Sequence, residues 1–401
     1  MPGFELFGEK EKLQVQDVLD SGVLMRYGFD GMRKDQWKAK ELEVAIADRM
    51  QTKHAQLVSS GTAALTVALV SAGVGAGDEV IMPTFTFVAS FESILAIGAI
   101  PVLVDIDDTL TLDPMAVEKA ITDQTKVVMP VHMCGSMANL RALKDICSKH
   151  DLLLLEDACQ AIGGSYEGKP LGSYGDLGCF SFDYVKTITC GEGGAIITNK
   201  EDYYKNADHY SDHGHDHIGK DRGAESHPFL GYNFRISELN AAVGCAQIHR
   251  LDEFITIQKR NYTIIRNHLE KIDGVTFRRV PDGGVENYSF LNFFLSSEEL
   301  TRTTHKSLGE AGVDACFYWF DNNWHYYKKW EHLTNLKSLG KLPEEVKNQL
   351  PDYKKSDFSN SDRWMGRTIS SLIKLSWTEA DVVKRAEKMA GVIKTNLNTG
   401  Q

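Results

Sequence analysis

Residues 180–194 read FSFDYVKTITCGEGG, in which one lysine, Lys186, precedes a tight glycine-rich turn. Glycine adopts backbone conformations that are closed to other residues, so this run fixes the turn and the direction of the lysine. Upstream, residues 152–157 read LLLLED, an apolar run that ends in Asp157. A short apolar run of this kind is typical of a buried strand. The two stretches predict a lysine and an acid held at the edge of a sheet.

Further short apolar runs alternate with helical patterns along the first part of the chain. The predicted strands cover residues 80–82, 102–104, 127–129 and 152–155, and the predicted helices cover residues 63–71, 87–97, 114–121 and 140–149. Strand and helix in alternation predict a mainly parallel α/β sheet with helices on both faces. Ligands of such sheets bind beyond the carboxyl ends of the strands, which is where Asp157 is expected.

The second part of the chain has a different pattern. Ser237 caps a predicted helix that continues to about residue 269. Strands are expected at residues 275–279 and 289–295, helices at 299–311 and 381–397, and a polar surface excursion at 338–361. We therefore predict a large domain, residues 1–255 with an N-terminal arm, and a smaller C-terminal α/β domain, residues 256–401.

The composition is ordinary for a soluble globular protein, with 401 residues of which 42% are hydrophobic and 25% charged. The formal net charge of −11 disfavours a surface for nucleic acid or an anionic membrane. No apolar run is long enough to span a membrane, and the N-terminus does not have the pattern of a secretory signal. Seven cysteines without CxxC spacing indicate reduced thiols. We expect a cytoplasmic protein with no nucleic-acid or membrane partner.

A lysine on a fixed turn and an acid at a strand end are what a pyridoxal 5′-phosphate enzyme requires. The amine of Lys186 would bond to the aldehyde of the cofactor, and Asp157 would keep the ring nitrogen protonated so that the ring accepts electrons. The alternatives are a surface lysine and a helix N-cap aspartate. The glycine-rich turn argues against the first, and Asp157 could combine both of its roles. Lys186 and Asp157 are the predicted catalytic residues.

A phosphate site is predicted where residues 59–65, SSGTAAL, follow a short apolar strand and open a helix. Gly61 lets the backbone approach an anion, the helix start offers free amides, and Thr62 adds a hydroxyl. An ordinary capped helix would have the same sequence, and the Gly-Lys-Ser/Thr ending of a P-loop is absent. Ser181 and Asn233 are further candidates for binding the phosphate.

Two side chains are candidates for contacts with the cofactor ring. Phe87 follows a predicted strand and could cover one face of a flat ring, although a core phenylalanine is the alternative. Gln160 lies shortly after Asp157 and could reach the phenolic oxygen of the ring if a helix begins between the two.

Two further segments have more than one interpretation. Residues 213–217 contain alternating histidines, which on a strand would share a face and could bind zinc. The surrounding glycines favour a loop, so we predict no metal site but a mobile substrate loop that includes Lys220 and Arg222. Residues 316–327 are rich in aromatic side chains, which either stack on sugars or fill a core.

Together these motifs resemble those of the sugar aminotransferases, a branch of the fold-type I pyridoxal-phosphate enzymes that aminates nucleotide-linked keto-sugars. The resemblance covers essentially the whole chain and is carried by residues 60–62, 83–87, 131–135, 156–161, 180–194 and 233–237. It implies that Lys186 is the acid–base catalyst and that pyridoxamine 5′-phosphate is the cofactor form between two half-reactions. It also implies a homodimer with shared active sites, in which Asn233 comes from the partner subunit.

A narrower resemblance, to the 8-amino-3,8-dideoxy-manno-octulosonate aminotransferases of this family, is carried by residues 1–8, 211–228 and 317–326. It implies that L-glutamate donates the amine. The implied acceptor is an 8-oxo-3,8-dideoxy-manno-octulosonate, a keto-sugar acid of lipopolysaccharide biosynthesis that is aminated at carbon 8. Its carboxylate requires a cation, ideally a bidentate arginine. The candidate substrate residues are Arg26, His215, Arg222 and Trp319, with Arg367 and Lys374 as further cations.

Three other functions compete with this interpretation. The first keeps the chemistry but takes a nucleotide-linked 4-keto-6-deoxy sugar as acceptor. The second is a pyridoxal-phosphate-binding regulator without turnover, which the absence of a basic recognition helix and the net charge disfavour. The third, a nicotinamide-dependent oxidoreductase, is disfavoured because residues 191–194 lack the G-x-G-x-x-G frame after a strand.

Overall fold

The computed structural model describes residues 2–219 and 223–399. Its centre is a mixed, mainly parallel sheet with the strand order β1-β9-β8-β5-β4-β2-β3. β9 (Gly194–Thr198) runs antiparallel to β1 (His54–Val58) and β8 (Leu177–Ser181). The other strands of this sheet run parallel to one another and to β8. They are β2 (Glu79–Pro83), β3 (Ile100–Val104), β4 (Thr125–Val128) and β5 (Leu153–Asp157).

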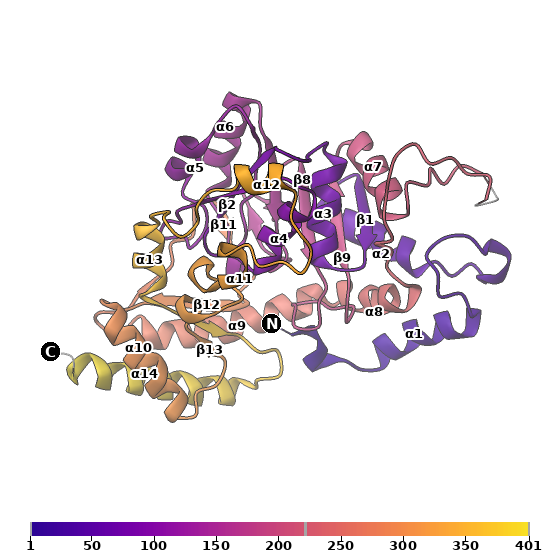
Figure 1. Cartoon of the computed structure of the whole chain (residues 1–401). Helices are drawn as coiled ribbons and strands as arrows, with labels where there is room; N and C mark the ends of the chain where they lie inside the picture. The colour runs from indigo at the N-terminus through magenta and orange to yellow at the C-terminus, as the bar shows by residue number, and fades with distance from the viewer. Residues whose placement is uncertain (1, 220–222, 400–401) are drawn as a thin grey trace.

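Helices cover both faces of this sheet (Figure 1). In chain order they are α1 (Glu9–Ser21), α2 (Lys38–Met50), α3 (Gly61–Ser71), α4 (Val88–Ala96), α5 (Pro114–Ala120), α6 (Leu140–His150), α7 (Glu201–Ser211) and α8 (Glu238–Ile248). Short 3-10 turns are η1 (Gly3–Leu6), η2 (Asp30–Met32) and η3 (Met133–Gly135). A minor sheet in the order β11-β6-β7 joins β6 (Ser165–Tyr166), β7 (Lys169–Pro170) and β11 (Gly284–Val285).

The C-terminal part of the chain forms a smaller lobe around a second sheet in the order β10-β12-β14-β13. Its strands are β10 (Thr276–Phe277), β12 (Phe290–Phe294), β13 (Cys316–Phe317) and β14 (Thr368–Leu372). Its helices are α9 (Leu251–Leu269), α10 (Glu298–Glu310) and α14 (Glu379–Thr399). In Figure 1, α9 runs beneath the large sheet toward α10 and α14, so that one long helix joins the two lobes.

Between β13 and β14 the chain leaves the small lobe and crosses the large one. This segment contains η4 (Trp319–Asp321), η5 (Tyr327–Lys329), α11 (Glu331–Thr334), α12 (Glu344–Gln349) and α13 (Ser359–Met365). Figure 1 shows α11 and α12 in front of the large lobe. Tyr326 and Trp330 are fully buried in the same hydrophobic core as residues of α3 and α4. The crossing therefore brings aromatic side chains to the edge of the large sheet.

The expected fold class is confirmed, because the large parallel sheet lies between helices and a smaller α/β lobe follows. Polar side chains cap the N-termini of several helices, as expected from the residues preferred at N-cap positions. Ser60, Asp113, Asn139, Ser237 and Ser297 each accept a backbone N–H of the first turn. The strands of the large sheet are almost continuously buried, as expected for a sheet that is covered on both faces.

One expectation differs from the structure. The single helix expected up to residue 269 is two helices, because α8 ends at Ile248 and α9 begins at Leu251. The polar stretch 338–361 is mostly exposed, as expected of a surface excursion. It is anchored to the large lobe where the buried Tyr353 donates its hydroxyl to the Pro101 carbonyl at 2.7 Å. The division at residues 255 and 256 falls inside α9 and remains a prediction. No helix of the described chain combines the length and apolarity needed to cross a membrane.

Candidate active site

Asp157 ends β5 at the carboxyl edge of the large sheet and is almost completely buried. Its Oδ2 accepts the hydroxyl of Ser90 at 2.8 Å, and its Oδ1 accepts the Cys159 N–H at 3.1 Å. The Asp157 N–H donates to the Pro130 carbonyl at 2.9 Å. These contacts from β5, α4 and the end of β4 hold the carboxylate in one orientation. The chain after Asp157 forms turns, so the N-cap interpretation does not apply.

Gln160 lies just beyond Asp157, half-buried. Its Oε1 accepts the Cys134 N–H at 2.9 Å, and its backbone carbonyl accepts the side-chain amide of Asn287 at 3.0 Å. The backbone donor identifies the oxygen of the Gln160 side chain, so its amide nitrogen lies on the other side. Gln160 therefore presents a donor that suits an oxygen of a ligand.

The start of α3 offers donors for an anion. Ser60 Oγ accepts the Ala63 N–H at 3.0 Å, which leaves the N–H groups of Gly61 and Thr62 without a partner inside the helix. The Thr62 side chain is exposed. A Cβ on Gly61 would lie 2.7 Å from Ser181 Cβ, so only glycine lets α3 approach the end of β8 this closely. The hydroxyls of Thr62 and Ser181 thus lie beside the same helix start.

The Lys186 turn is braced from two directions. Within the turn, the Lys186 N–H donates to the Asp183 carbonyl at 3.0 Å. From the N-terminal segment, the Gly3 N–H donates to the Lys186 carbonyl at 2.9 Å, and Phe4 stacks on Tyr184 with ring centroids 4.1 Å apart. The turn is therefore fixed by contacts far apart in the sequence.

Lys186 and Asp157 act on a common neighbour, the thiol of Cys159. Burial and the Asp157 carboxylate raise the pKa of this thiol, whereas the charge of Lys186 lowers it. A Cβ on Gly194, the last residue of the glycine-rich turn, would lie 2.3 Å from the Ser60 carbonyl. The lysine turn, the acid and the start of α3 therefore meet in one site.

Phe87 lies at the same edge of the sheet, immediately before α4, and is half-buried. Its ring stacks on Trp324 with centroids 5.5 Å apart and planes 10° apart. The Thr86 and Val88 N–H groups donate to the carbonyls of His325 and Trp324 at 3.0 and 2.8 Å. Backbone pairing thus holds the crossing segment against Phe87.

His325 is a member of the site that sequence reasoning missed. Its ring lies 5.4 Å from Phe87 and 4.4 Å from Trp319, centroid to centroid. The only signal in the sequence was the aromatic composition of residues 316–327, which did not single out the histidine. Trp319 itself is buried and stacks on Phe317, so it fills the core behind the site.

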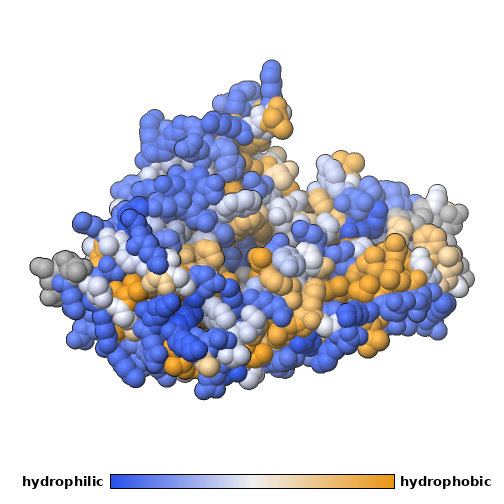
Figure 2. All heavy atoms as spheres, turned by 90° about the horizontal axis from the view of Figure 1, so that it is seen from below, coloured by the Kyte–Doolittle hydropathy of each residue, from blue (hydrophilic) through white to orange (hydrophobic). Residues whose placement is uncertain are grey.

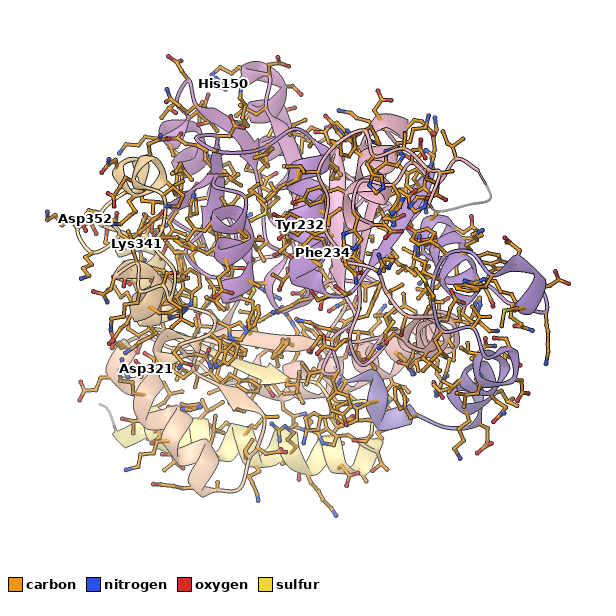
Figure 3. All side chains as sticks on the ribbon, turned by 45° about the vertical axis from the view of Figure 1, so that its right-hand side comes forward. His150, Tyr232, Phe234, Asp321, Lys341 and Asp352 are labelled. Carbon is orange, nitrogen blue, oxygen red and sulfur yellow. The ribbon has the colours of Figure 1, made fainter. Side chains whose placement is uncertain are left out.

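Asn233 is exposed and accepts the Arg235 N–H through its side chain at 3.2 Å. Its neighbour Phe234 is held to the end of β1, because the Phe234 carbonyl accepts the Ser59 N–H at 2.7 Å. Figure 3 shows Tyr232 and Phe234 close together on the large lobe, with ring centroids 6.0 Å apart. The side chain of Asn233 is therefore exposed at the surface, where another molecule can contact it.

Three of the predicted substrate cations, Arg26, Arg367 and Lys374, are engaged with other groups of the protein. Arg26 is buried in an ion pair with Glu43 and lines a cavity of about 430 Å³ beside the amino end of β1. Arg367 donates to the Leu295 carbonyl, and Lys374 pairs with Asp314 in the small lobe. Arg222 and Lys220 lie outside the described residues.

His215 belongs to the loop between α7 and α8. Its Nδ1 lies 3.0 Å from Glu225 Oε2, and its ring lies 4.0 Å from that of His227. Within residues 2–219 and 223–399, no group of three or more histidine, cysteine or acidic side chains is arranged to hold a metal.

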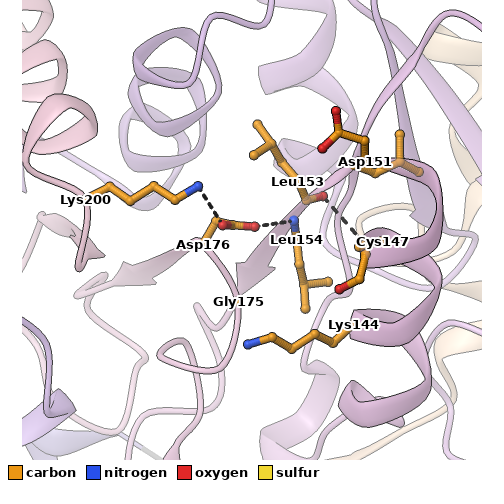
Figure 4. Close-up of a pocket in the computed structure, with 10 residues that line it drawn as sticks. Lys144, Cys147, Asp151, Leu153, Leu154, Gly175, Asp176 and Lys200 are labelled. Atoms are coloured by element: carbon orange, nitrogen blue, oxygen red, sulfur yellow. Dashed lines mark hydrogen bonds and ion pairs between the residues drawn. The ribbon is translucent and has the colours of Figure 1, made fainter.

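A second cavity, of about 280 Å³, lies at the start of β5, at the opposite end of this strand from Asp157 (Figure 4). Asp176 lines this cavity, where its carboxylate pairs with Lys200 Nζ at 2.8 Å and accepts the Leu154 N–H at 3.0 Å. This cavity is separate from the Lys186 site.

The fold defines the class of the protein as a fold-type I transferase, and a lysine turn, an acid and the start of a helix meet at one edge of its large sheet. A model of the DegT/DnrJ/EryC1/StrS aminotransferase family matches residues 6–389, and the chain belongs to this family. The expectation of an aminotransferase-family enzyme is thereby confirmed. The family is pyridoxal-phosphate-dependent.

The chain is similar to two GDP-perosamine synthases. It is 42% identical to that of Caulobacter vibrioides over 226 residues, which cover 55% of this chain and 58% of the relative. It is 34% identical to that of Vibrio cholerae over 294 residues, which cover 72% and 75%. The fold matches the crystal structure of an aminotransferase from Psychrobacter cryohalolentis with a TM-score of 0.84, 26% identity and 98% coverage of each chain.

Proposed function

We propose that the protein is a pyridoxal-phosphate-dependent aminotransferase that transfers an amino group to a keto-sugar. One observation carries this proposal. The Lys186 turn packs against the start of α3, while Asp157 is fixed at the end of β5 beside them. The family match over residues 6–389 supports the same reaction.

The residues at the site fit the cofactor. The free amides of α3 with the hydroxyls of Thr62 and Ser181 suit a phosphate. Asp157 suits a protonated ring nitrogen, Gln160 would donate to the phenolic oxygen, and Phe87 would cover a ring face. When bound, pyridoxal phosphate supplies an aldehyde for an amine and a ring that accepts electrons.

Lys186 moves the proton in this mechanism. Its Nζ would take the proton from the carbon that bears the amino group of glutamate and would pass it to the aldehyde carbon of the cofactor. In the second half-reaction Lys186 Nζ would act in reverse and deliver a proton to the sugar carbon that receives the amino group. The stacked rings of Phe87 and Trp324 would form one side of the site.

A second copy of the chain is proposed to complete the site. Six large apolar side chains near the N-terminus are exposed and form what we call the N-terminal apolar face. They are Leu13, Leu19, Leu24, Phe29, Met32 and Val44. Figure 2 shows hydrophobic atoms gathered on the side of the molecule where α1 lies. Burial of this face in a homodimer would explain its exposure, and the exposed Asn233 would then reach the phosphate of the partner.

Two acceptors are proposed for the amine. The names of the two relatives refer to a GDP-linked amino sugar, and this supports a nucleotide-linked 4-keto-6-deoxy sugar. The comparisons favour this acceptor over the free sugar acid.

The second candidate is the 8-oxo-3,8-dideoxy-manno-octulosonate. It is supported by the resemblance in residues 317–326, because the structure brings Trp324 and His325 from this segment to the edge of the site. Its carboxylate would need a cation other than Arg26, Arg367 or Lys374, since each of these is engaged elsewhere.

The test combines both acceptors with a control for the lysine. The protein is reconstituted with pyridoxal phosphate, given glutamate, separated from it and then mixed with either acceptor while the absorbance spectrum is followed. Only a true acceptor regenerates the starting spectrum. Lys186→Ala should abolish both conversions, whereas Lys144→Ala, at the separate cavity of Figure 4, should retain them. Full turnover by Lys186→Ala would refute the mechanism.

A further inference from the structure

His325 belongs to the crossing segment and lies against Phe87 at the edge of the large sheet. Its carbonyl pairs with the Thr86 N–H at 3.0 Å, and its ring contacts Phe87 and Trp319. The positive charge of Lys186 acts on this ring. The imidazole therefore faces the region between Lys186 and the aromatic rings of Phe87 and Trp319.

The hydrogen bonds of Asn322 determine which nitrogen of His325 carries the proton. Asn322 Oδ1 accepts the backbone N–H of Trp324 at 2.9 Å, which identifies this atom as the oxygen. The same oxygen lies 2.9 Å from His325 Nδ1. An amide oxygen only accepts hydrogen bonds, so Nδ1 must be the donor. In a neutral ring Nε2 then has the lone pair.

The ring is neutral at ordinary pH. Burial, followed by the charge of Lys186, lowers the pKa of His325 to about 3. Within residues 2–219 and 223–399, no side chain or backbone group hydrogen-bonds to Nε2. His325 thus offers one acceptor atom, Nε2, because the hydrogen bond from Nδ1 to Asn322 fixes the tautomer of the ring.

The geometry points to His325 as a specificity-determining residue whose Nε2 accepts a hydrogen bond from a hydroxyl of the acceptor sugar. This inference rests on the proposed function. A lone pair at this position favours a hydroxyl and repels a carbonyl or carboxylate oxygen, which can only accept. A polyhydroxylated sugar provides such a donor near its reacting carbon, whereas the glutamate side chain provides none. His325 should therefore serve the sugar half-reaction and not the glutamate half-reaction.

A matched pair of substitutions tests the role of Nε2. The amide of His325→Gln can reach the position of Nε2 and accept a hydrogen bond there, whereas the shorter His325→Asn reaches only that of Nδ1. Each half-reaction is measured by rapid mixing of the reconstituted enzyme, first with glutamate and then with a GDP-linked 4-keto-6-deoxy sugar or the octulosonate. We expect His325→Asn to slow the sugar half-reaction about tenfold or more and His325→Gln to restore much of it. The glutamate half-reaction should change less than about twofold in both variants.

A second measurement does not depend on turnover. Histidine ¹⁵N spectra of the wild-type protein, assigned by the loss of one signal in His325→Gln, report the tautomer directly. Proton attachment at Nδ1 and a free lone pair at Nε2 are expected. Asn322→Ala should remove this preference, because it removes the acceptor for Nδ1.

Several outcomes would overturn the inference. A proton on Nε2 in the wild-type spectrum would do so, as would equal slowing of both half-reactions or equal defects in the Gln and Asn variants. Failure of the proposed function looks different, because the wild-type protein would then aminate neither sugar while the tautomer remained as described.

Discussion

At the residue scale, the absence of one side chain decides how closely the start of α3 approaches the end of β8. A Cβ at residue 61 would lie 2.7 Å from Ser181 Cβ and 3.3 Å from Cys159 Sγ. Gly61→Ala should therefore push α3 away from β8 and lower the free energy of unfolding by about 1–3 kcal/mol. It should also weaken the binding of pyridoxal phosphate. Urea unfolding and a cofactor titration measure the two effects.

A glycine with free space around it provides the control. Gly309 lies inside α10, and a Cβ there would meet nothing within 4 Å. Gly309→Ala should leave cofactor binding unchanged and raise stability by up to about 1 kcal/mol. If both glycine variants behaved alike, close packing at residue 61 would not be the cause.

His325 also makes the stability of the fold sensitive to acid. Its pKa is about 3 in the folded protein and near the ordinary 6.5 in the unfolded chain. Between these values only the unfolded chain binds the proton, so stability falls as the pH drops from about 6.5 toward 3. His325→Gln should lose less thermal stability between pH 7 and pH 5 than the wild type, as measured by calorimetry. Equal losses would show that the histidine is not buried in its neutral form.

The sequence pointed most directly to residues whose sequence neighbours fix their local structure. Lys186 precedes its own glycine-rich turn, and Asp157 ends its own strand. Arg26 is a contrasting case. The sequence suggested it as a cation for a substrate carboxylate, and in the structure it forms an ion pair with Glu43 of α2, a contact that exists only after folding. His325 depends on the crossing of the chain between lobes, which no local pattern reveals.

At the element scale, the predictions succeeded where periodicity and capping agree. The strands β2 to β5 and the helices α3 to α6 lie within a few residues of their expected positions. The break between α8 and α9 was missed because both helices are strongly helical in pattern and no proline or glycine separates them. Residues 338–361 form the expected surface excursion, but the sequence did not reveal its anchor on the large lobe, because the few buried residues, such as Tyr353, are scattered among polar ones.

The crossing segment should depend on one buried indole. Trp330 is fully buried, and its ring lies 5.9 Å from that of Phe91 in α4. Trp330→Ala should lower the free energy of unfolding by about 3–5 kcal/mol, because it leaves a cavity between the segment and α4. Trp324→Ala is the matched control. Trp324 is 55% exposed, so the free energy of unfolding should fall by less than about 1 kcal/mol. Similar losses would contradict the proposed docking of the segment.

At the scale of the whole molecule, the N-terminal apolar face predicts association. Leu19 is 55% exposed on α1. Leu19→Glu would place a charge in the proposed interface and should shift the protein from dimer to monomer in light scattering. Activity should fall with the dimer, because Asn233 would no longer reach the partner's site. Leu339→Glu, on the crossing segment, should change neither property, and a monomeric wild type would refute the proposed dimer.

The bond from Gly3 to Lys186 makes the reacting turn part of the same unit as the first residues of the chain. Occupation of the site by the cofactor should then make the N-terminal segment more rigid, since anything that holds the turn also holds the backbone of Gly3. Limited proteolysis would make this visible. A protease that cuts between η1 and α1 should act more slowly on the loaded enzyme than on the cofactor-free one, and the rate of cutting would become a simple report of how firmly the lysine is held.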